Sequence, residues 1–430
     1  MRIADCNWTA IAVVAAALLG EAHPVMAGAK TATPAADATT LTVTLAGDVG
    51  LNPTNQSVGA KGVTDGGFQT WADTTANITP EINGDLNFMN VETVVTDRND
   101  LTPDLKGQSG PFNFRMHSNG LRHLVSTGFN VLSLANNHSM DYGVPGLKET
   151  LKNVNGLRGK GVMAAGGIGN TFGEAAQTDV FKIKGSTVAY AATGIITNDL
   201  ARHHAGPTSP GQTSYRDPQD FAAVRKGLTA ANADLRILSV HYGIEGQVRT
   251  DARQIADFRG LAADQDGIDL IVGHHAHVVR GVEMRGKSLI FYGLGNFLHH
   301  GTANITGKGV CRDYGLFARV HLAKAAEGHF EIKAVEAIPM ADTHRKTRRL
   351  TGESGAARVH VLNYLASTLD NAASGAKGLR FTPQKSGSGL YCVPGAEKLG
   401  GSIGVLCKGY ASAPAIPDNL RGSIAASCSR

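Results

Sequence analysis

The sequence is poor in charged residues and has no long run of basic side chains. Charged residues make up 18% of the 430 residues, and the formal net charge at pH 7 is +5. The basic residues are scattered and do not alternate with aromatic residues, as they do in proteins that bind single-stranded nucleic acid. The one dense run, HRKTRRL at 344–350, is expected at the solvated surface. We therefore expect no nucleic-acid partner, and a hydrophobic fraction of 42% indicates a globular chain with a sizeable core.

The apolar run near the N-terminus is too short to span a membrane. It reads WTAIAVVAAALLG at 8–20, whereas a spanning helix needs roughly 20 apolar residues. Arg2 precedes this run, and the small residues of VMAGA at 25–29 offer a cleavage site, which is the pattern of a secretory signal peptide. We expect residues 1–27 to be removed, an Ala/Thr-rich linker at 28–40, and a periplasmic or secreted protein. The alternative is an uncleaved membrane anchor.

Cysteine is scarce as well, with five residues in the whole chain. Cys6 would leave with the signal peptide, so the mature chain keeps Cys311, Cys392, Cys407 and Cys428. Their spacing resembles no zinc knuckle, and three of the four lie in the C-terminal tail. In an oxidising compartment they are expected to form two disulfides, with three connectivities left open.

Predicted strands and helices alternate along most of the chain. This alternation favours an α/β domain with largely parallel or mixed sheets over about residues 41–340, followed by a C-terminal extension at 341–430. The extension includes an apolar-faced helix that we expect to pack on the main domain. The main expected strands are 41–48, 187–194, 235–240, 268–273 and 287–297, and the expected helices include 143–161, 218–231, 251–264 and 357–370.

Polar residues follow one predicted strand after another. One polar strand end is an ordinary turn, but six are hard to obtain from turn chemistry alone. In α/β domains, ligands bind beyond the carboxyl ends of the strands, so these side chains are candidates for one site. They are Asp48, Glu92, Asn137 with His138, His241, His275 with His277, and Asn296.

This set combines carboxylate, amide and imidazole groups, which suit Zn, Mn or Fe better than a thiolate-loving ion. In GHHAH at 273–277 an extended backbone would turn His275 and His277 to one side and His274 to the other, a useful spacing for chelation. An H-x-H pair alone is weak, because histidine has many other roles. The order of all the polar strand ends is the stronger signal.

That order resembles the CapA, or poly-γ-glutamate capsule biosynthesis, family, a branch of the calcineurin-like metallophosphoesterases. The segments that carry the resemblance are AGDVGLN, NVE, LANNHSMDYG, HYGIE, GHHAHVVRGVE and YGLGNF, spread over about 300 residues. The resemblance implies a four-layer α-β-β-α sandwich of two mixed sheets, with a dinuclear metal centre where the sheets meet. It therefore implies two divalent ions, Mn, Fe or Zn.

The resemblance also implies roles for individual residues. His138 matches a catalytic histidine, and Asp141 is expected to take the part of its supporting acid. The usual D-x-H of the first strand is reduced to GDV, so one imidazole is missing and one ion is expected to be weakly held or differently ligated. The implied metal ligands are Asp48, Glu92 as a bridging carboxylate, Asn137, His241, His275 and His277.

Other residues are candidates for supporting roles. Glu245 and Glu283 are expected to accept hydrogen bonds from ligand histidines, with Asn296 in the same supporting group, although the two glutamates are equally well explained as surface acids of helices. Arg115 and Arg280 could bind the carboxylates of a polymer, and the alternative for both is a structural salt bridge.

Two functions follow from these expectations. The first is a metal-dependent, phosphoesterase-like hydrolase that acts on a phosphoester or an anionic polymer during capsule or poly-γ-glutamate synthesis, export or processing, alongside membrane-bound synthesis components. The second is a non-catalytic scaffold or polymer-binding component in the same system. Fold does not fix function, so metal-dependent turnover of a generic aryl phosphate is the observation that separates them.

Overall fold

The computed structural model describes residues 39–196, 200–263, 267–303, 309–373 and 375–429. The expected signal peptide at 1–27 and most of the linker lie outside these residues. In the described part of the chain, no helix is both long and apolar enough to cross a membrane.

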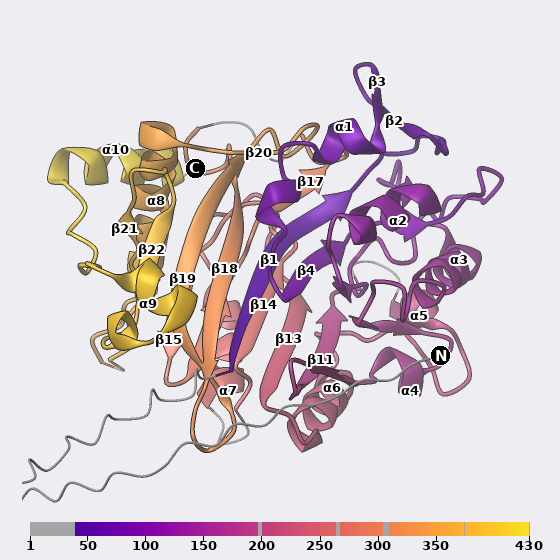
Figure 1. The fold of residues 1–430 in the computed structure, drawn as a ribbon. Helices are drawn as coiled ribbons and strands as arrows, with labels where there is room; N and C mark the ends of the chain where they lie inside the picture. The colour runs from indigo at the N-terminus through magenta and orange to yellow at the C-terminus, as the bar shows by residue number, and fades with distance from the viewer. Residues whose placement is uncertain (1–38, 197–199, 264–266, 304–308, 374, 430) are drawn as a thin grey trace, which may run out of the picture. The chain divides into compact units, whose positions relative to one another are not determined.

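The larger of two main sheets has ten strands (Figure 1). Its order is β21-β22-β19-β18-β1-β4-β7-β8, with β17 beside β1 and β20 beside β19. β1 runs parallel to β4 and β17 but antiparallel to β18, so the sheet is mixed. The strands are β1 (Thr40–Gly50), β4 (Leu86–Val91), β7 (Val131–Ser133), β8 (Ala164–Gly166), β17 (Asn296–His299), β18 (Gly315–Lys324), β19 (Phe330–Ala341), β20 (Arg348–Arg349), β21 (Thr382–Pro383) and β22 (Gly389–Cys392).

The second sheet has six strands in the order β10-β11-β13-β14-β16-β15. Its four central strands are parallel, and an antiparallel strand closes each edge. The strands are β10 (Asp179–Ile183), β11 (Ser186–Gly194), β13 (Leu235–His241), β14 (Leu270–His274), β15 (Val282–Arg285) and β16 (Ser288–Phe291). Three short pairs stand apart, β2 (Gly62–Thr64) with β3 (Phe68–Thr70), β5 (Val94–Val95) with β6 (Arg115–Met116), and β9 (Ile168–Gly169) with β12 (Gly211–Gln212).

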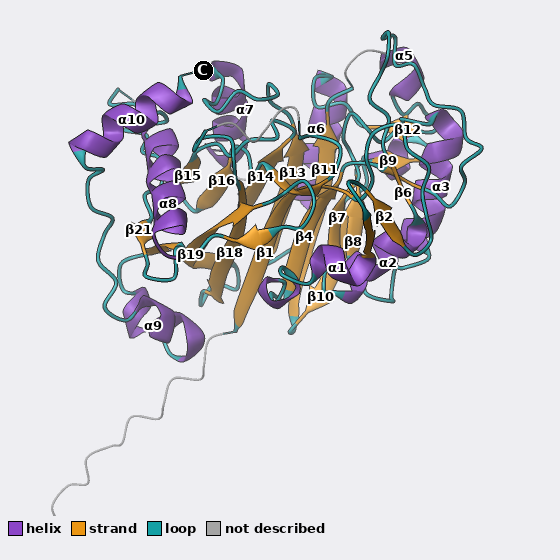
Figure 2. Cartoon of the chain, turned by 90° about the horizontal axis from the view of Figure 1, so that it is seen from above, coloured by secondary structure: helices purple, strands orange, loops and turns teal. Residues whose placement is uncertain are grey.

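Helices lie on the outer faces of the sheets and also beside the edge strands β15 and β21 (Figure 2). They are α1 (Trp71–Thr75), α2 (Ser118–Ser126), α3 (Gly143–Asn155), α4 (Phe172–Ala175), α5 (Leu200–His203), α6 (Pro218–Ala230), α7 (Ala252–Ala263), α8 (Gly352–Ser367), α9 (Gly401–Cys407) and α10 (Asp418–Cys428), with 3₁₀ turns η1 (Thr79–Glu81) and η2 (Ala396–Lys398). The expected helix at 218–231 is α6, which begins after the capping side chain of Asp217 with Pro218 in its first turn.

Side chains that alternate along each strand separate the layers. On β13, Ile237 packs with the β1 and β4 side chains of the other sheet, whereas Leu238 packs with helices α6 and α7. On β4, Phe88 faces the six-stranded sheet, whereas Met89 packs with α2 and α3. The period of two thus gives each sheet one face for the other sheet and one face for helices. This confirms the predicted α/β sandwich of two mixed sheets between helices.

The segment 287–297 was expected to be one strand, and this prediction was wrong. β16 ends at Phe291 in the six-stranded sheet, and β17 begins at Asn296 in the ten-stranded sheet. The chain crosses between the sheets through a turn in which Gly295 has a φ of 67°. Gly47 of β1 lies against the Gly295 carbonyl, where a Cβ would not fit, and the Asp48 N–H donates to that carbonyl at 3.1 Å.

β1 also continues beyond the expected end at Asp48, as far as Gly50. Its pairing with β17 shifts in register between Asp48 and Val49. Such an irregularity re-aims side chains at the end of a strand, and here it lies at the first of the polar strand ends.

The C-terminal extension adds to the main sheet and carries both disulfides. β19 runs across residue 340, and β20 and β22 pair with it. The expected helix at 357–370 corresponds to α8, whose Val359, Leu362 and Leu365 pack in the core between the sheets. The disulfides join Cys311 to Cys428 and Cys392 to Cys407, which is one of the three connectivities left open.

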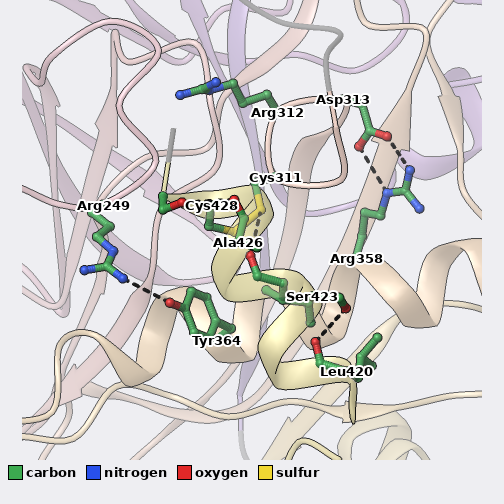
Figure 3. The surroundings of a disulfide bond; sticks show 12 residues. Arg249, Cys311, Arg312, Asp313, Arg358, Tyr364, Leu420, Ser423, Ala426 and Cys428 are labelled. Carbon is green, nitrogen blue, oxygen red and sulfur yellow. Dashed lines mark hydrogen bonds and ion pairs between the residues drawn. A yellow bond between two sulfur atoms is a disulfide. The ribbon is translucent and has the colours of Figure 1, made fainter. Parts of the chain in front are cut away.

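The Cys311–Cys428 disulfide ties α10 to the segment before β18 (Figure 3). Beside it, Arg358 of α8 forms an ion pair with Asp313, and Arg249 donates to the Tyr364 hydroxyl at 3.0 Å. The cross-link therefore lies among contacts that hold α8 and α10 to the sheets.

Candidate metal centre

Polar side chains from the ends of strands in both sheets meet in one buried cluster. Two sets of three residues share Glu92, and within each set the donor atoms lie within 4.8 Å of one another. We call Asp48, Glu92 and His277 the first donor group, and Glu92, His241 and His275 the second donor group. All five of these residues are buried. The six sequence-predicted ligands are thus brought together, with Asn137 joining the second donor group as described below.

In the second donor group the contacts run through His241, the last residue of β13. Its Nε2 lies 2.8 Å from Asn137 Oδ1, 3.0 Å from His275 Nδ1 and 3.3 Å from Glu92 Oε1. An amide oxygen, two imidazoles and a carboxylate therefore point at one small volume. That donor set matches a borderline divalent cation.

In the first donor group the contacts run through His277. Its Nδ1 lies 3.3 Å from Asp48 Oδ2, and its Nε2 lies 3.7 Å from Glu92 Oε1. Nδ1 is also 2.9 Å from Asn296 Oδ1, and the Asn296 amide donates to Thr302 at 2.8 Å. Asn296 therefore contacts both His277 and Thr302, and its expected supporting role stays a prediction.

The histidine loop after β14 reaches this arrangement in an unexpected way. The prediction of an extended backbone was wrong, because β14 ends at His274 and both His275 and His277 have positive φ, at 92° and 58°. Left-handed conformations of non-glycine residues are costly and cluster at functional sites. The turn, rather than strand alternation, brings the two imidazoles together with their ring centroids 6.1 Å apart.

The buried carboxylates of the cluster favour a nearby positive charge. Burial, and then the neighbouring Asp48 carboxylate, raise the pKa of Glu92 well above its usual value. Burial disfavours a charged imidazole at His277, yet Glu92 and Asp48 outweigh it and raise the pKa of His277 to about 10. Burial would also raise the pKa of Asp48, but its hydrogen bond and attraction to His277 lower it to about 2.

Glu92 provides the test of whether the residues fit a metal. Both of its carboxylate oxygens are buried and have no hydrogen-bond partner among the described residues. A buried carboxylate without partners is strongly disfavoured unless a cation or proton compensates it. The orphaned oxygens, surrounded by imidazole nitrogens, fit divalent cation binding.

A cavity of about 280 Å³ opens beside the cluster, and His138 lines it. His138 Nδ1 lies 2.8 Å from Asp141 Oδ2 and 3.2 Å from Lys106 Nζ, and Lys106 also forms an ion pair with Asp141. Glu245 lines the same cavity with its side chain 48% exposed, 4.0 Å from His275 Nε2. Asp141 thus contacts His138 as expected for a supporting acid.

The pKa values of this pair shift in opposite directions. Burial and then the Lys106 ammonium hold the pKa of the His138 imidazole well below its usual value. Burial raises the pKa of Asp141 to about 7, although Lys106 and the Phe114 N–H pull it down. Burial thus favours the neutral form of both groups.

Three sequence-predicted residues lie in positions that do not fit their expected roles. Glu283 binds Arg259 at 3.0 Å and the Tyr292 hydroxyl at 2.9 Å, so its carboxylate is occupied by partners other than the ligand histidines. Arg280 is fully buried, and its guanidinium donates to protein carbonyls at Gln247 and Ile244.

Arg115 is buried as well, and it donates to the carbonyls of Gln56 and Arg98 and stacks over the Tyr142 ring. Both arginines therefore stabilise loops by hydrogen bonds to their backbone carbonyls. The expectation that they face a bound polymer does not fit this geometry.

Several residues at the site were not predicted from the sequence. His274 lies 2.8 Å from His241 and 2.7 Å from the Ser239 hydroxyl, and Asn90 donates to Asp48 at 2.8 Å. Lys106 comes from a loop with no motif around it, so no sequence signal marked it. His299 is buried with its Nε2 3.7 Å from Glu92, and its place four residues after the predicted strand end at Gly295 was the available signal.

Residues 42–300 match the family described as bacterial capsule synthesis protein PGA_cap. The chain is 31% identical over 214 residues to the PGA biosynthesis protein CapA of Bacillus subtilis, covering 50% of this chain and 52% of that protein. It is also 31% identical over 180 residues to the capsule biosynthesis protein CapA of Bacillus anthracis, covering 41% and 42%.

The chain spans about half the length of the curated relatives it matches. Among solved structures, a phosphatase from Mycoplasma pneumoniae aligns with a TM-score of 0.41 at 12% identity, covering 71% of this chain and 94% of that one. The family match extends over more than half of the chain, and the protein belongs to the bacterial capsule synthesis family PGA_cap.

Proposed function

We propose that this protein is a secreted or periplasmic metal-dependent hydrolase that acts in the synthesis, export or processing of an anionic capsule polymer. The observation that carries the proposal is the pair of donor groups that share Glu92, beside a cavity lined by His138. The family match supports the capsule context. Membrane-bound synthesis components are the expected partners.

The donor groups are proposed to hold two divalent ions, Mn, Fe or Zn. The first ion would be held by Asp48, Glu92 and His277, and the second by Glu92, Asn137, His241 and His275. Divalent ions held there would supply Lewis-acid stabilisation of the negative charge that develops on oxygen during displacement. The orphaned Glu92 oxygens support this assignment.

His138 is the proposed proton donor to the leaving oxygen. Asp141 contacts its Nδ1, so the ring is held with Nε2 as the nitrogen available to a substrate in the cavity. Lys106 donates to the Asn137 carbonyl at 3.3 Å as well as contacting His138, and it thereby links the proposed proton donor to a proposed ligand.

The proposed substrate is a phosphoester or another anionic group of the polymer pathway. Relatives bear names that refer to PGA and capsule biosynthesis, and a polymer of glutamate is joined by amide bonds. Dinuclear centres hydrolyse phosphoesters in phosphatases and nucleases and amides in aminopeptidases, so the screen starts with phosphoesters and includes amides. A non-catalytic scaffold is the competing function, and the buried positions of Arg115 and Arg280 remove the support it drew from them.

The test is hydrolysis of a generic aryl phosphate with added Mn²⁺. Asn137→Ala and His275→Ala should each abolish metal-dependent turnover, whereas His329→Ala, a partly exposed histidine that contacts Lys287 and Glu331, should leave it unchanged. Circular dichroism would check that each variant is folded. No metal-dependent turnover by the folded wild-type protein on any phosphoester would favour the scaffold.

A further inference from the structure

His299 occupies the space in which a side chain at position 50 would stand. Gly50 and His299 are register partners on the parallel strands β1 and β17. A Cβ placed on Gly50 would lie 2.9 Å from His299 Nε2 and 3.0 Å from its Cε1. Gly50 has no left-handed φ, so its backbone does not require glycine. The imidazole of His299 requires it instead.

The His299 ring is aimed at the first donor group. Its Nε2 lies 3.7 Å from Glu92 Oε2, and its centroid is 5.8 Å from that of His277. Phe114 packs edge-on against the ring at 4.9 Å between centroids. His299 is fully buried, and its Nε2 has no hydrogen-bond partner among the described residues.

A buried ring nitrogen without a partner is disfavoured, so its position needs a physical cause. The two donor groups differ in a way that supplies one. The second donor group has four protein donors when Asn137 is included, whereas the first has three. The nitrogen of His299 lies near Oε2 of the shared Glu92, whereas His241 and His277 lie near Oε1.

We propose that His299 Nε2 is the fourth protein ligand of the first donor group, supplied from β17 in place of an imidazole on β1. The inference rests on the metal centre of the proposed function. On this proposal, the absence of a side chain at Gly50 leaves room for a ligand from the neighbouring strand. The first ion is then held as fully as the second.

The other ring nitrogen adds a condition. His299 Nδ1 accepts a hydrogen bond from the Gly301 N–H at 3.2 Å. When Nε2 binds an ion, the neutral ring carries its proton on Nδ1, so this hydrogen bond must open. The competing arrangement keeps the proton on Nε2, directed at Glu92, and His299 would then position the carboxylate without binding the ion.

The experiment measures ion content and affinity rather than turnover. Metal-free wild type, His299→Ala and His299→Gln are titrated with Mn²⁺ by calorimetry, and bound metal is counted by elemental analysis. His300→Ala is the matched control, because the neighbouring imidazole contacts Asp65 instead of the donor groups. Wild type and control should bind two ions, and His299→Ala should bind one tightly and the other about 100-fold or more weakly, beyond the 10–100-fold effect of outer-shell partners.

His299→Gln separates the two arrangements, because glutamine keeps an N–H donor but is a poor replacement for an imidazole ligand. Weak binding in His299→Gln supports ligation, and wild-type affinity in His299→Gln overturns it in favour of positioning. Unchanged affinity in His299→Ala also overturns the proposal. With Co²⁺ in the centre, the visible absorption spectrum should change in His299→Ala and not in His300→Ala.

The decisive variant moves the imidazole from position 299 to position 50. Gly50→His combined with His299→Ala should restore the second ion, because the new side chain enters the space that the old one leaves. If that variant does not fold, Gly50→Ala gives a second measurement. It should destabilise the wild type but be tolerated in His299→Ala, and equal destabilisation in both backgrounds would contradict the packing argument. A wild type that binds two ions but hydrolyses nothing would defeat the proposed function while leaving this inference intact.

Discussion

The metal centre and the C-terminal extension are held in place by different means. The centre lies at the ends of strands from two packed sheets, and its polar residues contact one another over sequence separations of 227 residues and more. No disulfide enters it. The extension consists of short strands and helices, with a small apolar cluster around Cys392, Ile403 and Cys407, and it contains three of the four disulfide cysteines.

This contrast indicates which interactions stabilise each of the two regions. Strand pairing and sheet packing position the donors, so the centre should tolerate loss of the cross-links. The extension has a small apolar cluster of its own and gains stability from the disulfides, which restrict the unfolded chain.

The largest effect is expected for Glu92→Gln, which removes the carboxylate shared by both donor groups. Ion content should fall from two to none at micromolar metal, and turnover should fall at least about 1000-fold, since metal stabilisation of the transition state is worth several kcal/mol. The extension should be unaffected, with both disulfides formed. Elemental analysis and the aryl phosphate assay measure the loss, with Glu331→Gln as a control on an acid outside the centre. Retention of both ions would rule out a bridging role for Glu92.

The next effect is expected for His138→Ala, which should reduce turnover by about 10²–10⁴-fold, the usual contribution of a general acid. Metal content should stay at the wild-type level, because the residue lies beside the donors and is not one of them. Asp141→Asn should act in the same direction through the hydrogen bond to His138. Metal loss in His138→Ala would mean that the imidazole belongs to the donor groups.

Removal of the disulfides should affect stability and spare the centre. Replacing Cys311 and Cys428 with alanine opens a loop of 117 residues, and the chain-entropy estimate of the loss is about 5 kcal/mol. The same change at Cys392 and Cys407 opens a loop of 15 residues and should cost about 3 kcal/mol. Urea unfolding measures both, and metal content should stay the same in the folded variants. Metal loss on opening the longer loop would show that the segment after β17 couples the two regions.

The smallest effect is expected at β19, the strand next to the extension. There the free energy of unfolding should decrease as the pH falls. Burial would raise the pKa of Glu336, but the hydrogen bond from His321 and the charge of Arg319 lower it to about 2. Because the folded pKa lies below the ordinary value of about 4.5, the ionised carboxylate stabilises the fold above pH 4.5. That contribution, on the order of 3 kcal/mol, should be lost as the pH falls from about 4.5 to 2.

Comparison of wild type with Glu336→Gln measures this contribution. The difference in unfolding free energy between the two proteins should shrink across that pH interval. A difference that is constant from pH 6 to pH 3 would contradict the assignment.

The sequence predicts local structure well where one periodicity dominates. β11, β13, β14, α6 and α8 were predicted because their apolar patterns and terminal residues agree with their packing. The set of polar strand ends was also accessible, since parallel strands end at a common edge.

What could not be predicted depends on contacts between distant segments. The division of 287–297 into β16 and β17 arises because the chain changes sheet, which no local pattern encodes. Arg280 and Glu283 have ordinary surface residue types, and only tertiary structure buries them. Lys106 reaches the centre from a loop, and His299 reaches it because the neighbouring strand carries a glycine.

The crossing from β16 to β17 has a mechanical consequence. Four residues separate Phe291 of one sheet from Asn296 of the other, and a chain of that length spans at most about 18 Å when fully extended. Packed sheets already lie about 10 Å apart, so this link leaves little slack for them to part at the site. The short covalent link therefore restricts how far the two sheets, and the donor groups at their strand ends, can separate.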